Sequence, residues 1–84
     1  MLTMKEAKAL SKLEGTAEGA ILEHMIKHRA GITGVTALSD YGLYRLSGAI
    51  HKLRHIYGID IATIMEEKGG KKYARYVLGE YANE

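Results

Sequence analysis

The spacing of apolar residues along this 84-residue chain changes near residue 58. Before that point, apolar side chains recur every three or four positions, which is the period of a helix that buries one face. After it, apolar and polar residues alternate, as is typical of β-strands. The pattern therefore predicts a mainly α-helical protein that ends in a small β structure.

Two helices are predicted within the first 31 residues. Thr3, followed three positions later by Glu6, forms a capping box that opens a first helix ending near Gly15. Thr16 can cap a second helix, which ends at Gly31. The apolar stripe of this second helix consists of Ile21, Leu22, Met25 and Ile26.

A short turn joins the next two predicted helices. An extended Ile32-Thr33 precedes a short helix that ends at Tyr41, and the turn Gly42-Leu43-Tyr44 leads into a longer helix from Arg45 to Tyr57. The apolar positions of the longer helix fit one stripe and are Leu46, Ala49, Ile50, Leu53 and Tyr57. Two helices joined by a short glycine-containing turn are typical of a helix-turn-helix.

The last third of the chain predicts a β-hairpin. Two runs of β-formers flank Gly69-Gly70, and side chains alternate from Tyr73 to Leu78. Helices followed by such a hairpin make a winged helix-turn-helix, here preceded by an extra N-terminal helix. We expect a helical extension over residues 1–15, the winged domain over 16–79 and a tail over 80–84.

Composition narrows the class of protein. A chain of this length buries only about 60% of its unfolded surface, so it holds one small domain. It has no Cys, which excludes disulfides and thiolate metal sites. No apolar run approaches the roughly 20 residues of a membrane span, and the N-terminus does not resemble a secretory signal. The expected location is the cytoplasm, without membrane contact.

Charge is distributed unevenly although the net charge is only +2. Residues 1–41 hold five basic and five acidic side chains, whereas residues 42–79 hold seven basic and three acidic ones. The second half, which contains the predicted helix-turn-helix and hairpin, is therefore the basic half. Such asymmetry favours a polyanionic partner.

One face of the Arg45–Tyr57 helix is a candidate for contacting double-stranded DNA. Rotation by about 100° per residue places polar residues opposite the apolar stripe. Ser47 and His51 can reach base edges, Gly48 allows close backbone approach, and basic side chains can reach phosphates. The predicted helix contacts are Tyr44, Arg45, Ser47, Gly48, His51, Lys52, Arg54 and His55. The hairpin tip adds Lys68, Lys71 and Lys72, which suit contacts along the backbone or in the minor groove.

Several of these segments resemble the small helix-turn-helix proteins of bacteriophages and prophages, over about residues 20–78. The segments that carry the resemblance are Ile32-Thr33, Arg45-Leu46-Ser47, Leu53-Arg54, Gly58 with Ile61, and Tyr73-Ala74-Arg75-Tyr76. Members often carry Arg where this chain has Ala49. The resemblance implies phage-encoded DNA binding in a bacterial host, on the nucleoid when bound to DNA, and no single regulatory role.

Other chemistry finds little support in the sequence. Two histidine pairs have the i, i+4 spacing of metal ligands, His24 with His28 and His51 with His55, but nothing completes either set. The chain has no Cys nucleophile and no Gly-x-Ser-x-Gly, and Gly69-Gly70-Lys71-Lys72 lacks the Walker spacing. We expect no metal, no cofactor and no enzymatic activity.

Two functions and two oligomeric states stay open at this point. The first function is a DNA-binding transcriptional regulator or accessory factor, and the second is a protein-interaction module that inhibits a host defence or polymerase complex. Leu2, Leu10 and Leu13 offer a hydrophobic seam for a homodimer through the N-terminal helix. The same residues could instead pack on the domain itself.

Overall fold

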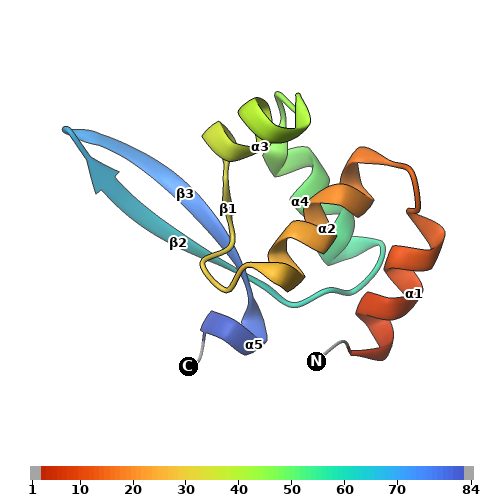
Figure 1. Ribbon diagram of the computed structural model, residues 1–84. Helices are drawn as coiled ribbons and strands as arrows, with labels where there is room; N and C mark the ends of the chain where they lie inside the picture. The colour runs from red at the N-terminus through yellow and green to blue at the C-terminus, as the bar shows by residue number, and fades with distance from the viewer. Residues whose placement is uncertain (1–2, 83–84) are drawn as a thin grey trace.

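A computed structural model describes residues 3–82 of the chain (Figure 1). Within these residues the helices and strands follow in the order predicted for a winged helix-turn-helix. They are α1 (Met4–Lys12), α2 (Ala17–Lys27), β1 (Ile32–Thr33), α3 (Gly34–Tyr41), α4 (Leu46–His55), β2 (Ile61–Lys68), β3 (Lys71–Leu78) and α5 (Gly79–Ala82). The predicted fold class is confirmed, and α5 is the one element that the pattern did not predict.

Threonine caps begin the first three helices. At α1, the Glu6 amide donates to Thr3 Oγ1 and the Thr3 amide donates to Glu6 Oε1, both at 3.2 Å. Thr16 and Thr33 accept in the same way from the amides three residues ahead. These bonds satisfy amides that have no partner inside the helix, so the predicted helix starts are confirmed.

Helix α1 packs against α2 of the same chain. Ala9 and Leu13 are buried, and Leu10 packs against the same core cluster. Gly19 allows the close approach, because a Cβ there would collide with the Leu13 carbonyl. Leu10 and Leu13 therefore pack on their own domain, the second of the two alternatives, while Leu2 lies outside the described residues.

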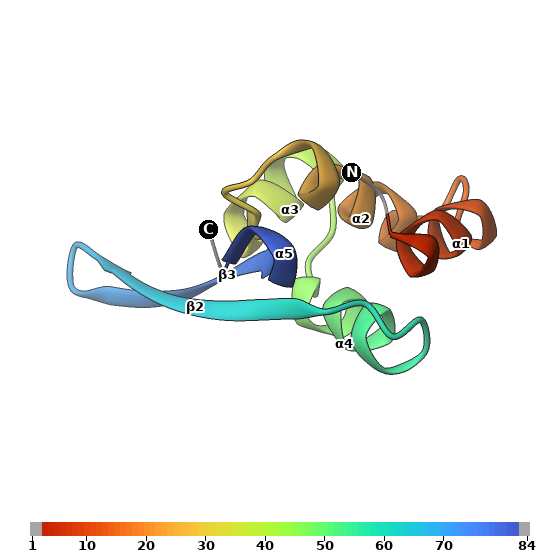
Figure 2. The same ribbon diagram turned by 90° about the horizontal axis from the view of Figure 1, so that it is seen from below.

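The three strands form one antiparallel sheet in the order β1-β3-β2. Strands β2 and β3 pair from Ile61 opposite Leu78 to Lys68 opposite Lys71. Gly69 and Gly70 close the hairpin with φ of 59° and 79°, left-handed values that match a two-residue hairpin turn. The hairpin extends well beyond the helices (Figure 2), which leaves its basic tip open to a partner.

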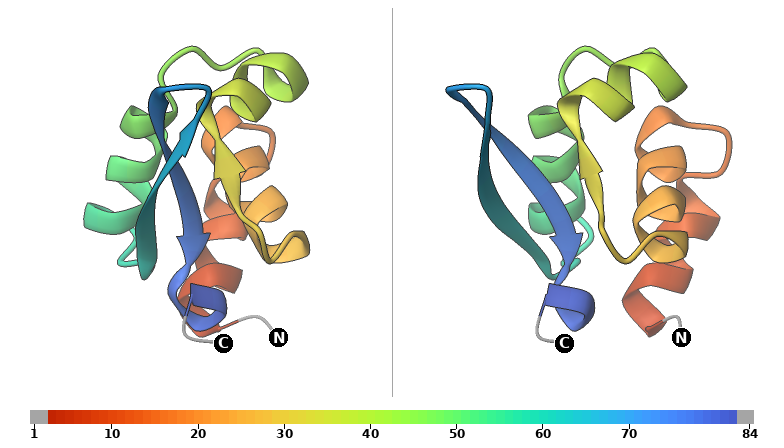
Figure 3. Two further views of the ribbon diagram at one scale, coloured as in Figure 1. Left: turned by 90° about the vertical axis from the view of Figure 1, so that its left-hand side faces the viewer. Right: turned by 60° about the vertical axis from the view of Figure 1, so that its left-hand side comes forward.

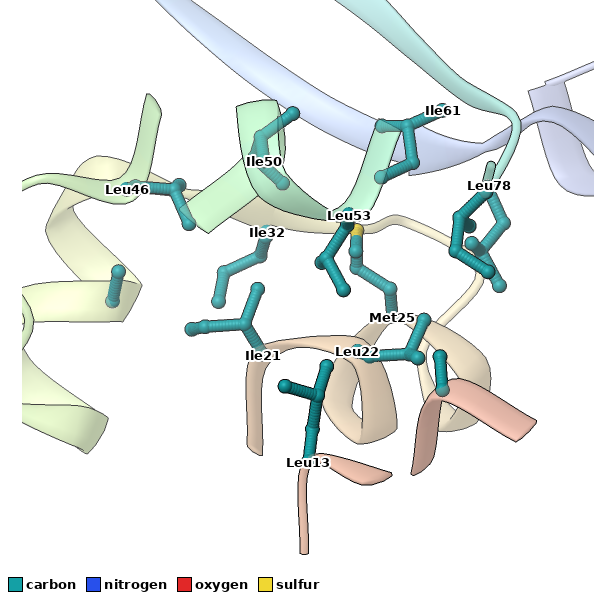
Figure 4. Packing of buried hydrophobic residues seen from close by; sticks show 13 residues of the cluster. Leu13, Ile21, Leu22, Met25, Ile32, Leu46, Ile50, Leu53, Ile61 and Leu78 are labelled. Atoms are coloured by element: carbon teal, nitrogen blue, oxygen red, sulfur yellow. The ribbon is translucent and has the colours of Figure 1, made fainter. Parts of the chain in front are cut away.

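The hydrophobic core lies between α2, α4 and the base of the sheet (Figure 4). Its fully buried larger side chains are Ile21, Leu22, Met25, Ile32, Ile50, Leu53 and Leu78. Every predicted helical stripe contributes to this cluster, so α4 is held with its apolar side inward. Its opposite side is consequently free to meet a ligand.

The C-terminal residues belong to the folded domain, which corrects the predicted tail for residues 80–82. The Tyr81 hydroxyl donates to the Ile26 carbonyl at 2.9 Å, and the Arg29 guanidinium lies 5.2 Å from the Tyr81 ring centroid. These contacts fix α5 against the end of α2. Residues 83–84 of the expected tail lie outside the described residues.

Candidate nucleic-acid interface

Helix α4 presents the predicted polar face to solvent. Leu46, Ala49, Ile50 and Leu53 are buried, as the apolar stripe requires. The residues opposite them are exposed and comprise Ser47, Gly48, His51, Lys52 and His55. Ala49 is 5% exposed, so this position lies on the core side of the helix.

The start of α4 is the most open part of this surface. Tyr44, in the turn before the helix, is 86% exposed. Arg45 occupies the N-cap position without making a side-chain capping bond and is also exposed. Further along, the His51 and His55 rings lie together with their centroids 4.3 Å apart. All four side chains are therefore accessible to a partner.

Arg54 contacts its own chain, in place of the predicted role at a phosphate. Its Nε and Nη2 donate to the Ile61 carbonyl at 3.1 and 2.7 Å, and Nη2 also donates to Thr63 Oγ1 at 2.6 Å. The guanidinium carbon lies 5.8 Å from the Tyr76 ring centroid. These contacts fasten α4 to β2.

Lys52 is engaged by an acidic partner from another helix. Its Nζ lies 3.0 Å from Oε1 of Glu18, at the start of α2. Hydrogen bonds from the backbone of Glu18 itself and from Lys52 lower the pKa of the Glu18 carboxyl. Lys52 remains about half exposed, so a phosphate could reach it in competition with Glu18.

The hairpin carries its positive charge at the tip. Lys68, Lys71 and Lys72 are all exposed. Nearer the base, Arg75 Nε donates to Glu66 Oε1 at 2.7 Å and Arg75 Nη1 donates to the Ala30 carbonyl at 3.3 Å. The tip, the start of α3 and the α3–α4 turn lie toward one end of the molecule (Figure 3).

A groove of about 470 Å³ separates the start of α4 from β3. Its lining comes from the start of α3, the turn before α4, and the strand. The lining residues are Thr33, Gly34, Val35, Tyr44, Arg45, Leu46, Ser47, Tyr73, Ala74 and Tyr76. A second hollow, of about 450 Å³, shares three of these residues and reaches the lysines of the hairpin tip.

Sequence reasoning missed four side chains of this region as candidate site residues: Thr33, Val35, Tyr73 and Tyr76. Val35 is 78% exposed although it is apolar and helical. The alternation after Gly70 predicts that Tyr73 and Tyr76 lie on opposite faces of one strand, whereas both line this groove in the structure. Which face meets α4 depends on how the sheet packs, and the alternation alone does not say.

The remaining candidate chemistry lies away from this surface. His24 Nδ1 and the Tyr41 hydroxyl are 2.8 Å apart, and burial with the neighbouring His28 lowers the pKa of His24. Among residues 3–82, no three potential ligands from His, Cys, Asp and Glu gather as a metal site would need. In the same part of the chain, no helix has the length and apolarity to cross a membrane.

A short helix, a tight turn, an exposed second helix and a basic hairpin together define a winged helix-turn-helix domain, a fold that suggests DNA binding. Residues 16–81 match the family model described as winged helix-turn-helix domain, so the chain belongs to that family. No curated protein and no solved structure matches the chain. The match excludes α1, which the structure nevertheless places in the same core.

Proposed function

We propose that this protein binds double-stranded DNA with α4 in the major groove and the β2–β3 hairpin along the adjacent backbone. Polar and basic side chains on α4 would contact base edges and phosphates. The residues of α4 and of the turn before it that are assigned to this role are Tyr44, Arg45, Ser47, Gly48, His51, Lys52 and His55, with Lys68, Lys71 and Lys72 on the hairpin.

The observation that carries the proposal is the joint exposure of the start of α4, which lines one groove, and of the hairpin tip, which lines the adjoining hollow. A helix fits the major groove of B-DNA, and lysines at an exposed tip can contact phosphates. Arg54 is left out of the contact set, since its guanidinium bonds to Ile61 and Thr63. Its contribution would be to hold helix and hairpin at the angle that a duplex requires.

The test compares two double lysine variants by titrating a labelled duplex at several salt concentrations. Lys71→Ala with Lys72→Ala should weaken binding and reduce the slope of log K against log salt by about 1 for each phosphate that the protein no longer neutralises. Lys8→Ala with Lys12→Ala makes the same charge change on α1, far from the hairpin (Figure 1). If both double variants reduced the duplex affinity and the salt slope equally, the proposed DNA-binding face would be refuted.

The biological role we propose is a phage-type transcriptional regulator or accessory factor of a DNA transaction. The family match and the resemblance of its motifs to phage and prophage proteins support it. Selection of bound duplexes from a random pool would identify the recognised sequence and any half-site spacing. A pool that shows no enrichment would argue against sequence-specific regulation.

A protein-interaction role is the second candidate, and the apolar surface of α3 favours it. Val35 is 78% exposed and Leu38 is 45% exposed. If this role is correct, a host partner should co-purify from nuclease-treated lysate, and Leu38→Glu should abolish its capture. Duplex affinity at moderate salt, unaffected by Leu38→Glu, would favour the DNA role instead.

A further inference from the structure

The groove between α4 and β3 is unusually rich in tyrosine. Tyr44 lines it from the turn, and Tyr73 and Tyr76 line it from the strand, so it receives three of the six tyrosines of the chain. Tyr44 is 86% exposed, so its ring contributes little to the core. An aromatic ring left open in a groove is available to stack on a planar ligand.

A cationic hollow adjoins this aromatic groove. Tyr73, Thr33 and Val35 line both. The remaining lining of the second hollow consists of Lys68, Lys71, Lys72 and Arg75. Aromatic and cationic surfaces side by side match the two parts of a nucleotide, its flat base and its anionic phosphate.

Polar groups at the edge of the groove suit a base as well. Ser47 is exposed and its hydroxyl can both donate and accept a hydrogen bond. Arg45 is exposed and offers five donors to a base edge or a phosphate. The bases of an intact duplex are stacked and paired, so their faces cannot reach a tyrosine. A base that has left the stack can.

We propose that this groove receives an unstacked base, so that the protein binds DNA containing an unpaired nucleotide more tightly than the fully paired duplex. The inference rests on the proposed DNA-binding function and specifies the form of DNA that this surface prefers. An unpaired base should gain more binding energy from entering the groove than a paired base, because little pairing energy is lost when it leaves the helix.

The experiment compares a duplex that carries one bulged 2-aminopurine with the same duplex fully paired. The bulged DNA should bind at least about fivefold more tightly, the lower end of what stacking of one base contributes. Bound protein should also change the 2-aminopurine fluorescence, which reports on stacking. Tyr44→Ala should remove the preference, and Tyr44→Phe, which keeps the ring, should retain it.

Met65→Ala is the matched control, because Met65 is 63% exposed on the hairpin and does not line the groove. Equal affinity of wild-type protein for the two DNAs would overturn the inference and leave the proposed function standing. A Tyr44→Ala variant that weakens both DNAs equally would also overturn it, since the preference for the unpaired base would then not depend on the tyrosine. Failure to bind either DNA would refute the proposed function itself.

Discussion

Replacing Gly31 with alanine tests how closely β1 must approach β3. Gly31 is buried at φ +78°, and a Cβ there would collide with the Tyr76 carbonyl and lie 2.8 Å from Val77 Cγ2. The left-handed backbone costs a residue with a Cβ about 1–2 kcal/mol. Displacing packed neighbours costs about 1–3 kcal/mol more. Gly31→Ala should therefore lower the free energy of unfolding by about 2–5 kcal/mol.

Gly42→Ala separates these two costs. Gly42 has a similar φ of +65°, but no atom lies within 4 Å of the position its Cβ would take. This variant should lose only the backbone share, about 1–2 kcal/mol. Urea denaturation followed by circular dichroism would measure both, against a total of about 4–12 kcal/mol for a domain of this size. Equal losses would refute the argument that β3 crowds Gly31.

Three further predictions concern charged side chains. Burial, together with the neighbouring Glu80 carboxyl, raises the pKa of Glu6. The protonated carboxyl is therefore favoured in the folded protein, and the stability that it contributes is lost as pH rises through the folded-state pKa. Glu6→Gln keeps the capping box and should gain stability relative to wild type as pH rises from about 4. A difference in unfolding free energy that does not change with pH would contradict this. Glu18→Gln frees Lys52 and removes a negative charge near the proposed DNA-binding face, so duplex affinity should rise about two- to fivefold at low salt. An unchanged affinity would mean that the ion pair does not compete with DNA. Arg54→Gln should lower the free energy of unfolding, measured by chemical denaturation, by about 1–3 kcal/mol. The salt slope of DNA binding should stay unchanged. A slope reduced by about 1 would mean that the guanidinium contacts a phosphate.

Much of the fold could be predicted because its determinants act over a few residues. Thr3 with Glu6 is a complete capping box within one helical turn. Leu46, Ile50 and Leu53 define the buried side of α4 by their spacing alone. Gly69-Gly70 supplies the two left-handed residues that a tight hairpin turn requires.

The exposed face of α4 followed from the same periodicity, but the state of its charged side chains did not. Lys52 meets Glu18 from a position 34 residues away. Both residues lie on helix surfaces whose relative placement depends on how α2 and α4 pack. A long side chain takes the partner that packing brings within reach, and the spacing of one helix does not identify that partner.

Local features of the sequence were enough to predict the order of the elements as far as β3, the buried sides of α2 and α4, and the basic hairpin, since caps, periods and turn residues act over a few positions. Three features depend on the tertiary structure: α1 packs into the core of the domain, Arg54 bonds α4 to β2, and three tyrosines line one groove. Each of these depends on segments far apart in the chain meeting at a particular angle. That angle is set by the whole core, because close-packed side chains from every element must fit together at once.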